Sequence, residues 1–281
     1  MSGLQAADAA DRITQKHRTV FAADGVVKIA DAVSGEWVER ILEVAEQQLR
    51  VPGDWVSDTN PGATENRLFT SRYRWEVDPV IGEFVFGSGM AQMAAALMES
   101  RTARFYFDHL LVKEPRTASP TPWHQDIPYW PFLGKQICSA WVAMTAATVA
   151  ESSLEFVRGS HHWDSYYAPE SFDGKRGFMA AFEGEKMPDV EADRAAYDIV
   201  GFDVEPGDAL FFSSWLIHGS PGNAGDRRRV ALSTRWLGDD AVWHPHPGCD
   251  PTVGDADTTA RAGEYPADDR RFPLVAVQAA A

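Results

Sequence analysis

From residue 103 onward, the chain contains a series of short β-like runs separated by turn residues, and this pattern limits the possible folds most strongly. The runs lie at 103–113, 138–144, 154–157, 208–212 and 229–237. Between them, clusters such as Glu-Pro-Gly-Asp at 205–208 and Pro-Gly-Asn at 221–223 mark turns. Several short strands after a helical N-terminal part predict a mainly β fold, an antiparallel sandwich or jelly roll with helices packed on one side.

The N-terminal part has the residue spacing of helices. We expect a helix over 8–22, a short strand at 26–29 and a helix over 88–98. Ser34 has the residue type of an N-cap for a further helix. The apolar stripe of that helix consists of Trp37, Ile41, Leu42, Ala45 and Leu49. Residues 50–75, which contain several Pro, Gly and Asn, are expected to form a loop.

The sequence contains neither repeats nor low-complexity linkers, which predicts a single domain over 1–281. We expect frayed ends at about 1–8 and 278–281. The polar and irregular stretch at about 164–200 has the features of a long insertion. In a compact domain such an insertion is often a lid or a binding loop.

The net charge of −15 argues against some classes of partner. It repels a phosphate backbone, so we expect no nucleic-acid partner, and it disfavours a coenzyme A thioester as substrate. Two cysteines, Cys138 and Cys249, are too few for a disulfide framework, which fits a reducing compartment. Because we find neither a signal-peptide core nor an apolar stretch of membrane length, we expect a cytoplasmic protein with no membrane partner.

The segment 121–126, Thr-Pro-Trp-His-Gln-Asp, contains a His-x-Asp pair. On a strand, residues two apart face the same side, so His124 and Asp126 can both reach one metal ion. Two imidazoles and one carboxylate, with open positions opposite, suit a non-haem Fe(II) oxygenase. The pair alone is weak evidence, because such a pair occurs by chance in many proteins.

His218 follows an apolar strand and is the candidate for the third ligand, although a lone His at a strand end is more often structural. Arg229 lies eleven residues later, at the start of the next predicted strand. Its guanidinium fork suits bidentate binding of a carboxylate. Arg229 shares its strand face with Ala231, Ser233 and Arg235, and small residues beside an Arg leave room for a ligand.

With these residues in place, the chain resembles the phytanoyl-CoA dioxygenase (PhyH) family of Fe(II)- and 2-oxoglutarate-dependent oxygenases. The matching segments are FAADGVVKI (21–29), LLVKEP (110–115), TPWHQDIPYWPF (121–132), CSAWVAM (138–144), VRGSH (157–161) and the run that begins with GDALFFSSWLIHGSPGN at 207. Together they cover most of 20–237, and their ordered combination is highly specific. The resemblance implies a double-stranded β-helix, a jelly-roll core of the cupin type.

The same resemblance implies a dioxygenase that uses O2 to hydroxylate, or otherwise oxidise, a small organic substrate, with release of succinate and CO2. It places the iron ligands at His124, Asp126 and His218. It assigns the distal carboxylate of the 2-oxoglutarate cosubstrate to Arg229, with the hydroxyl of Ser220 nearby. Further candidate contacts of the cosubstrate are Trp141, His109, Lys113, Gln125 and Arg72.

Asp126 bears on the type of reaction, because related halogenases have a small residue at this position. A carboxylate there favours hydroxylation or another oxidation over halogenation. Two alternatives stay open: a non-catalytic metal-binding jelly roll that acts as a sensor or binding protein, and a zinc hydrolase with the same ligands. A zinc hydrolase would not need Arg229. The sequence leaves the substrate and the oligomeric state open.

Overall fold

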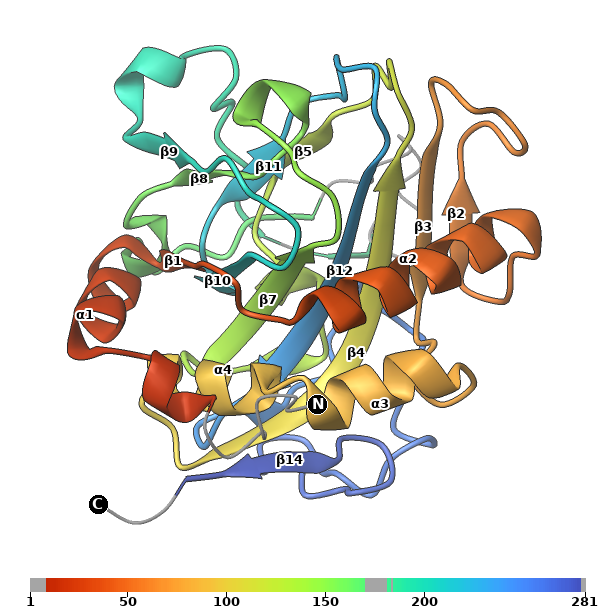
Figure 1. The fold of residues 1–281 in the computed structure, drawn as a ribbon. Coiled ribbons are helices and arrows are strands. Elements are labelled where there is room, and N and C mark those ends of the chain that lie inside the picture. The colour runs from red at the N-terminus through yellow and green to blue at the C-terminus, as the bar shows by residue number, and fades with distance from the viewer. Residues whose placement is uncertain (1–8, 170–180, 183, 279–281) are drawn as a thin grey trace.

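The computed structural model describes residues 9–169, 181–182 and 184–278. The frayed ends predicted at 1–8 and 279–281 lie outside the described residues. The same holds for residues 170–180 and 183 of the predicted insertion. The remainder of the chain is shown in Figure 1.

Two antiparallel sheets form the centre of the described structure. The larger sheet has the order β1 (Val26–Ile29), β10 (Ala209–Ser213), β7 (Ile137–Ala143), β12 (Arg229–Leu237), β4 (Thr102–Lys113), β3 (Leu68–Arg72) and β2 (Val56–Asp58), with β14 (Leu274–Val277) paired to β4. The smaller sheet has the order β5 (Thr121–His124), β11 (His218–Ser220), β8 (Glu155–Val157) and β9 (Ile199–Gly201). This arrangement confirms the predicted mainly β, jelly-roll class.

The two faces of the larger sheet are covered differently. Its inner face packs against the smaller sheet through buried apolar side chains such as Trp141, Phe156 and Phe212. Its outer face is covered by helices, which cross in front of the strands in Figure 1. These helices are α1 (Gln15–Asp24), α2 (Gly35–Arg50), α3 (Pro79–Gly87) and α4 (Met90–Met98). The predicted packing of helices on one side is therefore confirmed.

The shorter elements complete the connections between the strands. Single turns of 3-10 helix occupy Ala10–Arg12, Ile127–Tyr129, Val149–Glu151, Ser160–His162 and Arg194–Ala196. A third, two-stranded sheet pairs β6 (Phe132–Leu133) with β13 (Val242–Trp243). Around that sheet, aromatic side chains including Tyr106, Trp130 and Phe272 form a second buried cluster. Through this cluster, the chain segment that follows β12 packs against the N-terminal half of β4.

Several predicted elements of the N-terminal part are present, but their bounds and their buried residues differ in part from the prediction. The strand at 26–29 is β1, and Ser34 stands at the N-cap of α2, but its side chain makes no capping hydrogen bond. The first helix is shorter than the predicted 8–22, because the capping box of Thr14 and His17 starts α1 at Gln15. Ile41 and Ala45 of α2 are buried as expected. The remaining buried residues of that helix are Val38, Val44 and Gln48, while Trp37, Leu42 and Leu49 are only partly buried.

The predicted loop at 50–75 was wrong, because β2 and β3 lie within it and extend the larger sheet beyond β4. The helix predicted over 88–98 corresponds to α4, and α3 before it was missed. No single helix among the described residues is long and apolar enough to span a membrane. The pair of α3 and α4, bent by 42°, reaches that length and composition only in combination. The residues of α4 are nearly all buried in the core.

One buried acid makes the stability of this fold depend on pH. Asp108, in β4, accepts hydrogen bonds from the backbone N–H groups of Arg74 (2.9 Å) and Trp75 (3.0 Å). Burial nevertheless raises the pKa of Asp108 from its usual 3.8 to about 6. Between these two values the folded protein binds a proton that the unfolded chain has released. The stabilisation by protonated Asp108 is therefore complete at acid pH and is lost as the pH rises through about 6.

We expect the variant Asp108→Asn, which carries a neutral group at every pH, to lack this dependence. The free energy of unfolding of Asp108→Asn relative to the wild type should rise between pH 4 and pH 7 by up to about 3 kcal/mol. Urea unfolding at a series of pH values measures this difference. A difference that is the same at pH 4 and pH 7 would contradict the assigned titration.

Candidate active site

Strand pairing brings together the two histidines of the predicted metal site. In the smaller sheet, His218 of β11 lies directly opposite His124 of β5. The prediction that Asp126 continues the same strand was wrong, because β5 ends at His124. Asp126 has a helical backbone conformation and begins the turn Ile127–Tyr129. Its backbone N–H donates to the carbonyl oxygen of Ser214 at 3.0 Å, and this contact holds the turn in place.

The side chains of these three residues converge. One ligand atom from each of His124, Asp126 and His218 lies within 4.8 Å of the other two. Oδ1 of Asp126 is 3.7 Å from Nε2 of His124 and 4.0 Å from Nε2 of His218. All three side chains are buried, and they line the same cavity. Two imidazole nitrogens and one carboxylate oxygen form the donor set of a non-haem iron site.

Hydrogen bonds outside the triad fix which atom each ligand presents. Nδ1 of His124 donates to the carbonyl oxygen of Pro122 at 2.7 Å, and Nδ1 of His218 donates to that of Leu216 at 3.0 Å. Both Nε2 atoms are therefore left as acceptors for a metal ion. Oδ2 of Asp126 accepts a hydrogen bond of 2.6 Å from the hydroxyl of Ser139, in β7, which leaves Oδ1 facing the imidazoles.

The charge states of the buried ligands also suit a divalent metal. Burial lowers the pKa of His218 to about 3, and the neighbouring His124 adds to the effect, so His218 is neutral at physiological pH. Burial alone would raise the pKa of Asp126. The hydrogen bond with His124 and the nearby His218 and Arg235 outweigh this effect and hold the pKa of Asp126 well below its usual value. The site thus offers a neutral imidazole and an ionised carboxylate without rearrangement.

A single row of residues across four adjacent strands forms the floor of the cavity. Arg72 of β3 pairs with His109 of β4, His109 pairs with Ser233 of β12, and Ser233 pairs with Trp141 of β7. All four line the cavity, which has a volume of about 100 Å³. Nε2 of His109 and Oγ of Ser233 are buried there and have no hydrogen-bond partner among the described residues. The row therefore presents unsatisfied polar atoms to a ligand.

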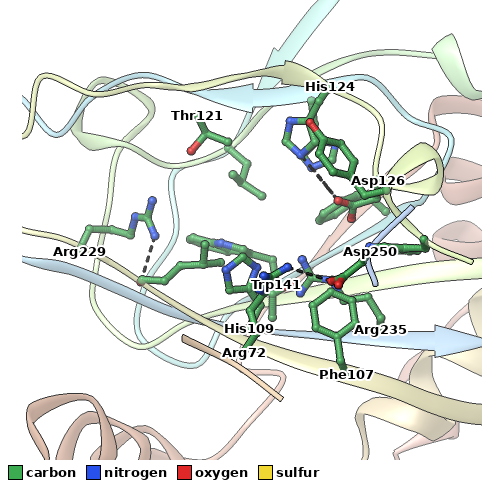
Figure 2. A pocket seen from close by; sticks show the side chains of 17 residues that line it. Arg72, Phe107, His109, Thr121, His124, Asp126, Trp141, Arg229, Arg235 and Asp250 are labelled. Atoms are coloured by element: carbon green, nitrogen blue, oxygen red, sulfur yellow. Dashed lines mark hydrogen bonds and ion pairs between the residues drawn. The ribbon is translucent and has the colours of Figure 1, made fainter. Parts of the chain in front are cut away.

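Arg229 occupies one end of this cavity, as Figure 2 shows. Its Nη1 donates to the carbonyl oxygen of Leu111 at 3.2 Å, and its guanidinium carbon lies 5.6 Å from the ring centre of Trp141. Nε of Arg229 is buried without a partner in the described part of the chain. Burial lowers the pKa of Arg229 to about 10, so the group stays charged at neutral pH. A buried, charged and incompletely paired guanidinium is suited to hold a carboxylate.

Three other predicted contacts lie outside the cavity lining. The hydroxyl of Ser220 accepts a hydrogen bond of 2.8 Å from Nζ of Lys113, which also donates to the carbonyl oxygen of Pro221. The side chain of Gln125 bonds to the backbone of Ser165, Trp215 and Tyr167. Thr121, the strand partner of Ser220, lines the cavity instead.

The opposite end of the cavity contains residues to which the sequence had assigned no role. Arg235 lies there beside Arg72, and Nη1 of Arg72 forms an ion pair of 3.0 Å with Asp250 (Figure 2). Asp250 lies beyond the last predicted strand, so only the fold brings it to the site. The sequence did contain a signal for Arg235, because its position six residues after Arg229 places it on the same face of the predicted strand. No described residue of the predicted insertion at 164–200 lines the cavity.

Ser139 provides a test of how the metal ligands are held. We expect Ser139→Ala to weaken the binding of Co(II) or Zn(II) about tenfold or more, because Asp126 loses the hydrogen bond that orients its carboxylate. Calorimetric titration of metal into the metal-free protein measures the affinity. Ser57→Ala, in the exposed part of β2, is the matched control. Equal affinities in Ser139→Ala and the wild type would show that this hydrogen bond does not support the site.

Comparison with known proteins agrees with this site. The family model Phytanoyl-CoA dioxygenase (PhyH) matches residues 21–231. A "Probable phytanoyl-CoA dioxygenase" from Caenorhabditis elegans is 25% identical over 245 residues, which are 81% of this chain and 76% of that protein. The "Phytanoyl-CoA dioxygenase, peroxisomal" of Homo sapiens is 31% identical over 136 residues, 47% of this chain and 38% of the human protein.

Solved structures share the fold. The non-haem α-ketoglutarate-dependent carbocyclase SnoK from nogalamycin biosynthesis superposes with a TM-score of 0.73 at 23% identity, over 95% of this chain and 98% of SnoK. EctD from S. alaskensis, solved with 2-oxoglutarate and 5-hydroxyectoine, gives 0.67 at 20% identity, over 90% and 86% of the two chains. The family model spans well over half of the sequence. The chain therefore belongs to the phytanoyl-CoA dioxygenase (PhyH) family of non-haem iron, 2-oxoglutarate-dependent oxygenases.

Proposed function

We propose that the protein oxidises a small organic substrate, with Fe(II) held by His124, Asp126 and His218 and with 2-oxoglutarate bound through Arg229. The observation that carries this proposal is the shape of the site. Three ligand atoms converge on the wall of a buried cavity, and an incompletely paired guanidinium lies at one end of the same cavity. Family membership supports the reaction class, an Fe(II)- and 2-oxoglutarate-dependent dioxygenase.

The residues of the triad position the metal and keep it accessible. Nε2 of each histidine and Oδ1 of Asp126 bind it, and the surrounding hydrogen bonds hold these atoms in place. Bound iron supplies the coupling of 2-oxoglutarate oxidation by O2, which yields succinate and CO2, to oxidation of the substrate. Asp126 fills the ligand position that is vacant in halogenases, which supports hydroxylation or another oxidation.

Arg229 and its neighbours orient the cosubstrate. Its guanidinium binds the distal carboxylate, with Trp141 packed alongside and the hydroxyl of Thr121 available in place of Ser220. Lys113 is the direct strand partner of Arg229, and its hydrogen bond to Ser220 links β4 to β11 beside this site. His109 and Arg72 remain candidates for direct contact, since both line the cavity. Gln125 serves as an anchor for the backbone behind the triad.

The substrate is a small molecule. The structural relatives include the epimerase SnoN, solved with nogalamycin RO, and EctD, solved with 5-hydroxyectoine, and both of these ligands are small organic molecules. The apolar part of the cavity wall, with Phe107, Tyr129, Trp130 and Leu154, suits a partly apolar compound. The two cysteines are free, which is consistent with the proposed cytoplasmic location.

Turnover without added substrate tests the reaction class. We expect the protein with Fe(II), ascorbate and 2-oxoglutarate to form succinate slowly in air, and we expect His218→Ala and Asp126→Ala to abolish this, because each removes a ligand. Succinate is measured by chromatography, and His244→Ala, at an exposed histidine, is the control. Tight binding of 2-oxoglutarate without succinate formation would favour the sensor alternative. Hydrolysis supported by Zn(II) alone would favour the zinc hydrolase.

Arg229 has its own test. We expect Arg229→Gln to raise the apparent KM for 2-oxoglutarate about a hundredfold, because a buried carboxylate loses its charged partner. Arg227→Gln, two residues earlier and exposed, should leave the KM unchanged. Initial rates of succinate formation over a range of 2-oxoglutarate concentrations give both values. A normal KM in Arg229→Gln would contradict the assignment.

A further inference from the structure

Arg235 is a buried cation for which the proposed reaction has no use. It lies in β12, six residues after Arg229 and on the same face, at the other end of the cavity. The residue is 6% exposed, and its Nε and Nη1 atoms are buried without a hydrogen-bond partner among the described residues. An arginine buried without a partner is costly, and such groups are normally paired or bound to a ligand.

The surroundings of Arg235 leave its donors free. Its guanidinium carbon lies 4.8 Å from the ring centre of Phe107 and 5.8 Å from that of Trp130. The strand pairing between β12 and β4 is irregular between Thr234 and Trp236, where β4 has one residue more than β12 opposite Arg235. Bulges often redirect a side chain next to an active site. Contacts with aromatic rings support the cation, but they do not satisfy its N–H groups.

The hydrogen bonds and ion pairs of the neighbouring acids go to groups other than Arg235. Arg72 is paired with Asp250, and Asp108, behind the cavity, accepts hydrogen bonds from backbone N–H groups. If Fe(II) is bound, the carboxylate of Asp126 neutralises one of the two positive charges of the metal ion. The other charge and that of Arg229 are matched by the two carboxylates of 2-oxoglutarate. Arg235 itself forms no ion pair with an acid of the described residues, so its N–H groups are available to an acidic ligand.

We propose that Arg235 binds a carboxylate of the substrate, so that the protein acts on a partly apolar organic acid. This inference rests on the proposed function, because it takes Arg229 as the partner of the cosubstrate. The guanidinium fork matches a carboxylate through two parallel hydrogen bonds, and Phe107 and Trp130 provide the apolar wall beside it. A substrate held in this way has its acid group fixed at one end of the cavity and its apolar part beside the metal ligands.

The test compares acids with their uncharged analogues. The probes are benzoate, phenylacetate, 3-phenylpropanoate and 4-phenylbutanoate, each beside its primary amide. They are titrated calorimetrically into protein loaded with Zn(II) and 2-oxoglutarate, since zinc has no redox chemistry and the complex cannot turn over. We expect at least one acid to bind about tenfold or more tightly than its amide, as a charge-assisted hydrogen bond allows.

The variants assign that preference to one residue. Arg235→Gln should remove the preference for acids while leaving the Kd of 2-oxoglutarate within about twofold of the wild type, and Arg235→Lys should retain part of the preference. Arg227→Gln, at an exposed site, controls for the change in net charge. The inference is overturned if no acid of the series is preferred, or if Arg235→Gln keeps the preference. It is also overturned if Arg235→Gln loses 2-oxoglutarate instead.

These outcomes separate the two proposals. If the wild type forms succinate with Fe(II) but shows no preference for acids, only the role of Arg235 fails. If the wild type forms no succinate under any condition, the proposed function itself fails. Retention of the wild-type melting temperature in Arg235→Gln and Arg235→Lys shows that each variant is folded when its binding is compared.

Discussion

The pairing of His218 with His124 across β11 and β5 is the contact on which the rest of the site depends. It brings together two residues that are far apart in the sequence, and their position opposite one another depends on the strand register. A shift by one residue would turn either imidazole to the opposite face. Asp126 joins them only because the chain leaves β5 in a helical turn, and Ser139 of the facing sheet then fixes its carboxylate.

The larger sheet supplies the other half of the site. One face of β12 carries Arg229, Ser233 and Arg235, so a single strand places a cation at each end of the cavity with a small residue between them. Two cations at a distance from one another can receive two different anions, while His124 and His218 lie on the opposite sheet. In the proposed assignment, the register of β12 places the cosubstrate and the substrate at opposite ends of the cavity.

The sequence predicted this architecture well where local pattern and global fold agree. The main strand runs and the start of β12 at Arg229 follow from the residue pattern, whereas Asp126 joins the two histidines from a turn after β5. The errors have physical causes. Pro and Gly between 50 and 75 concealed the hairpin of β2 and β3, which is formed by pairing with β4. Ser220 stays a predicted contact of the cosubstrate, and its hydroxyl accepts a hydrogen bond from Lys113 in this structure. Asp250 reaches the cavity through a long irregular segment, and no local pattern encodes such a contact.

The most direct test of this account is a crystal structure of the protein grown without oxygen in the presence of Mn(II) and 2-oxoglutarate. The account predicts one metal ion bound by Nε2 of His124, Nε2 of His218 and Oδ1 of Asp126. It also predicts the distal carboxylate of 2-oxoglutarate on Arg229, with the guanidinium of Arg235 still free. A metal ion bound elsewhere, or a 2-oxoglutarate molecule whose distal carboxylate lies on Arg235, would contradict it.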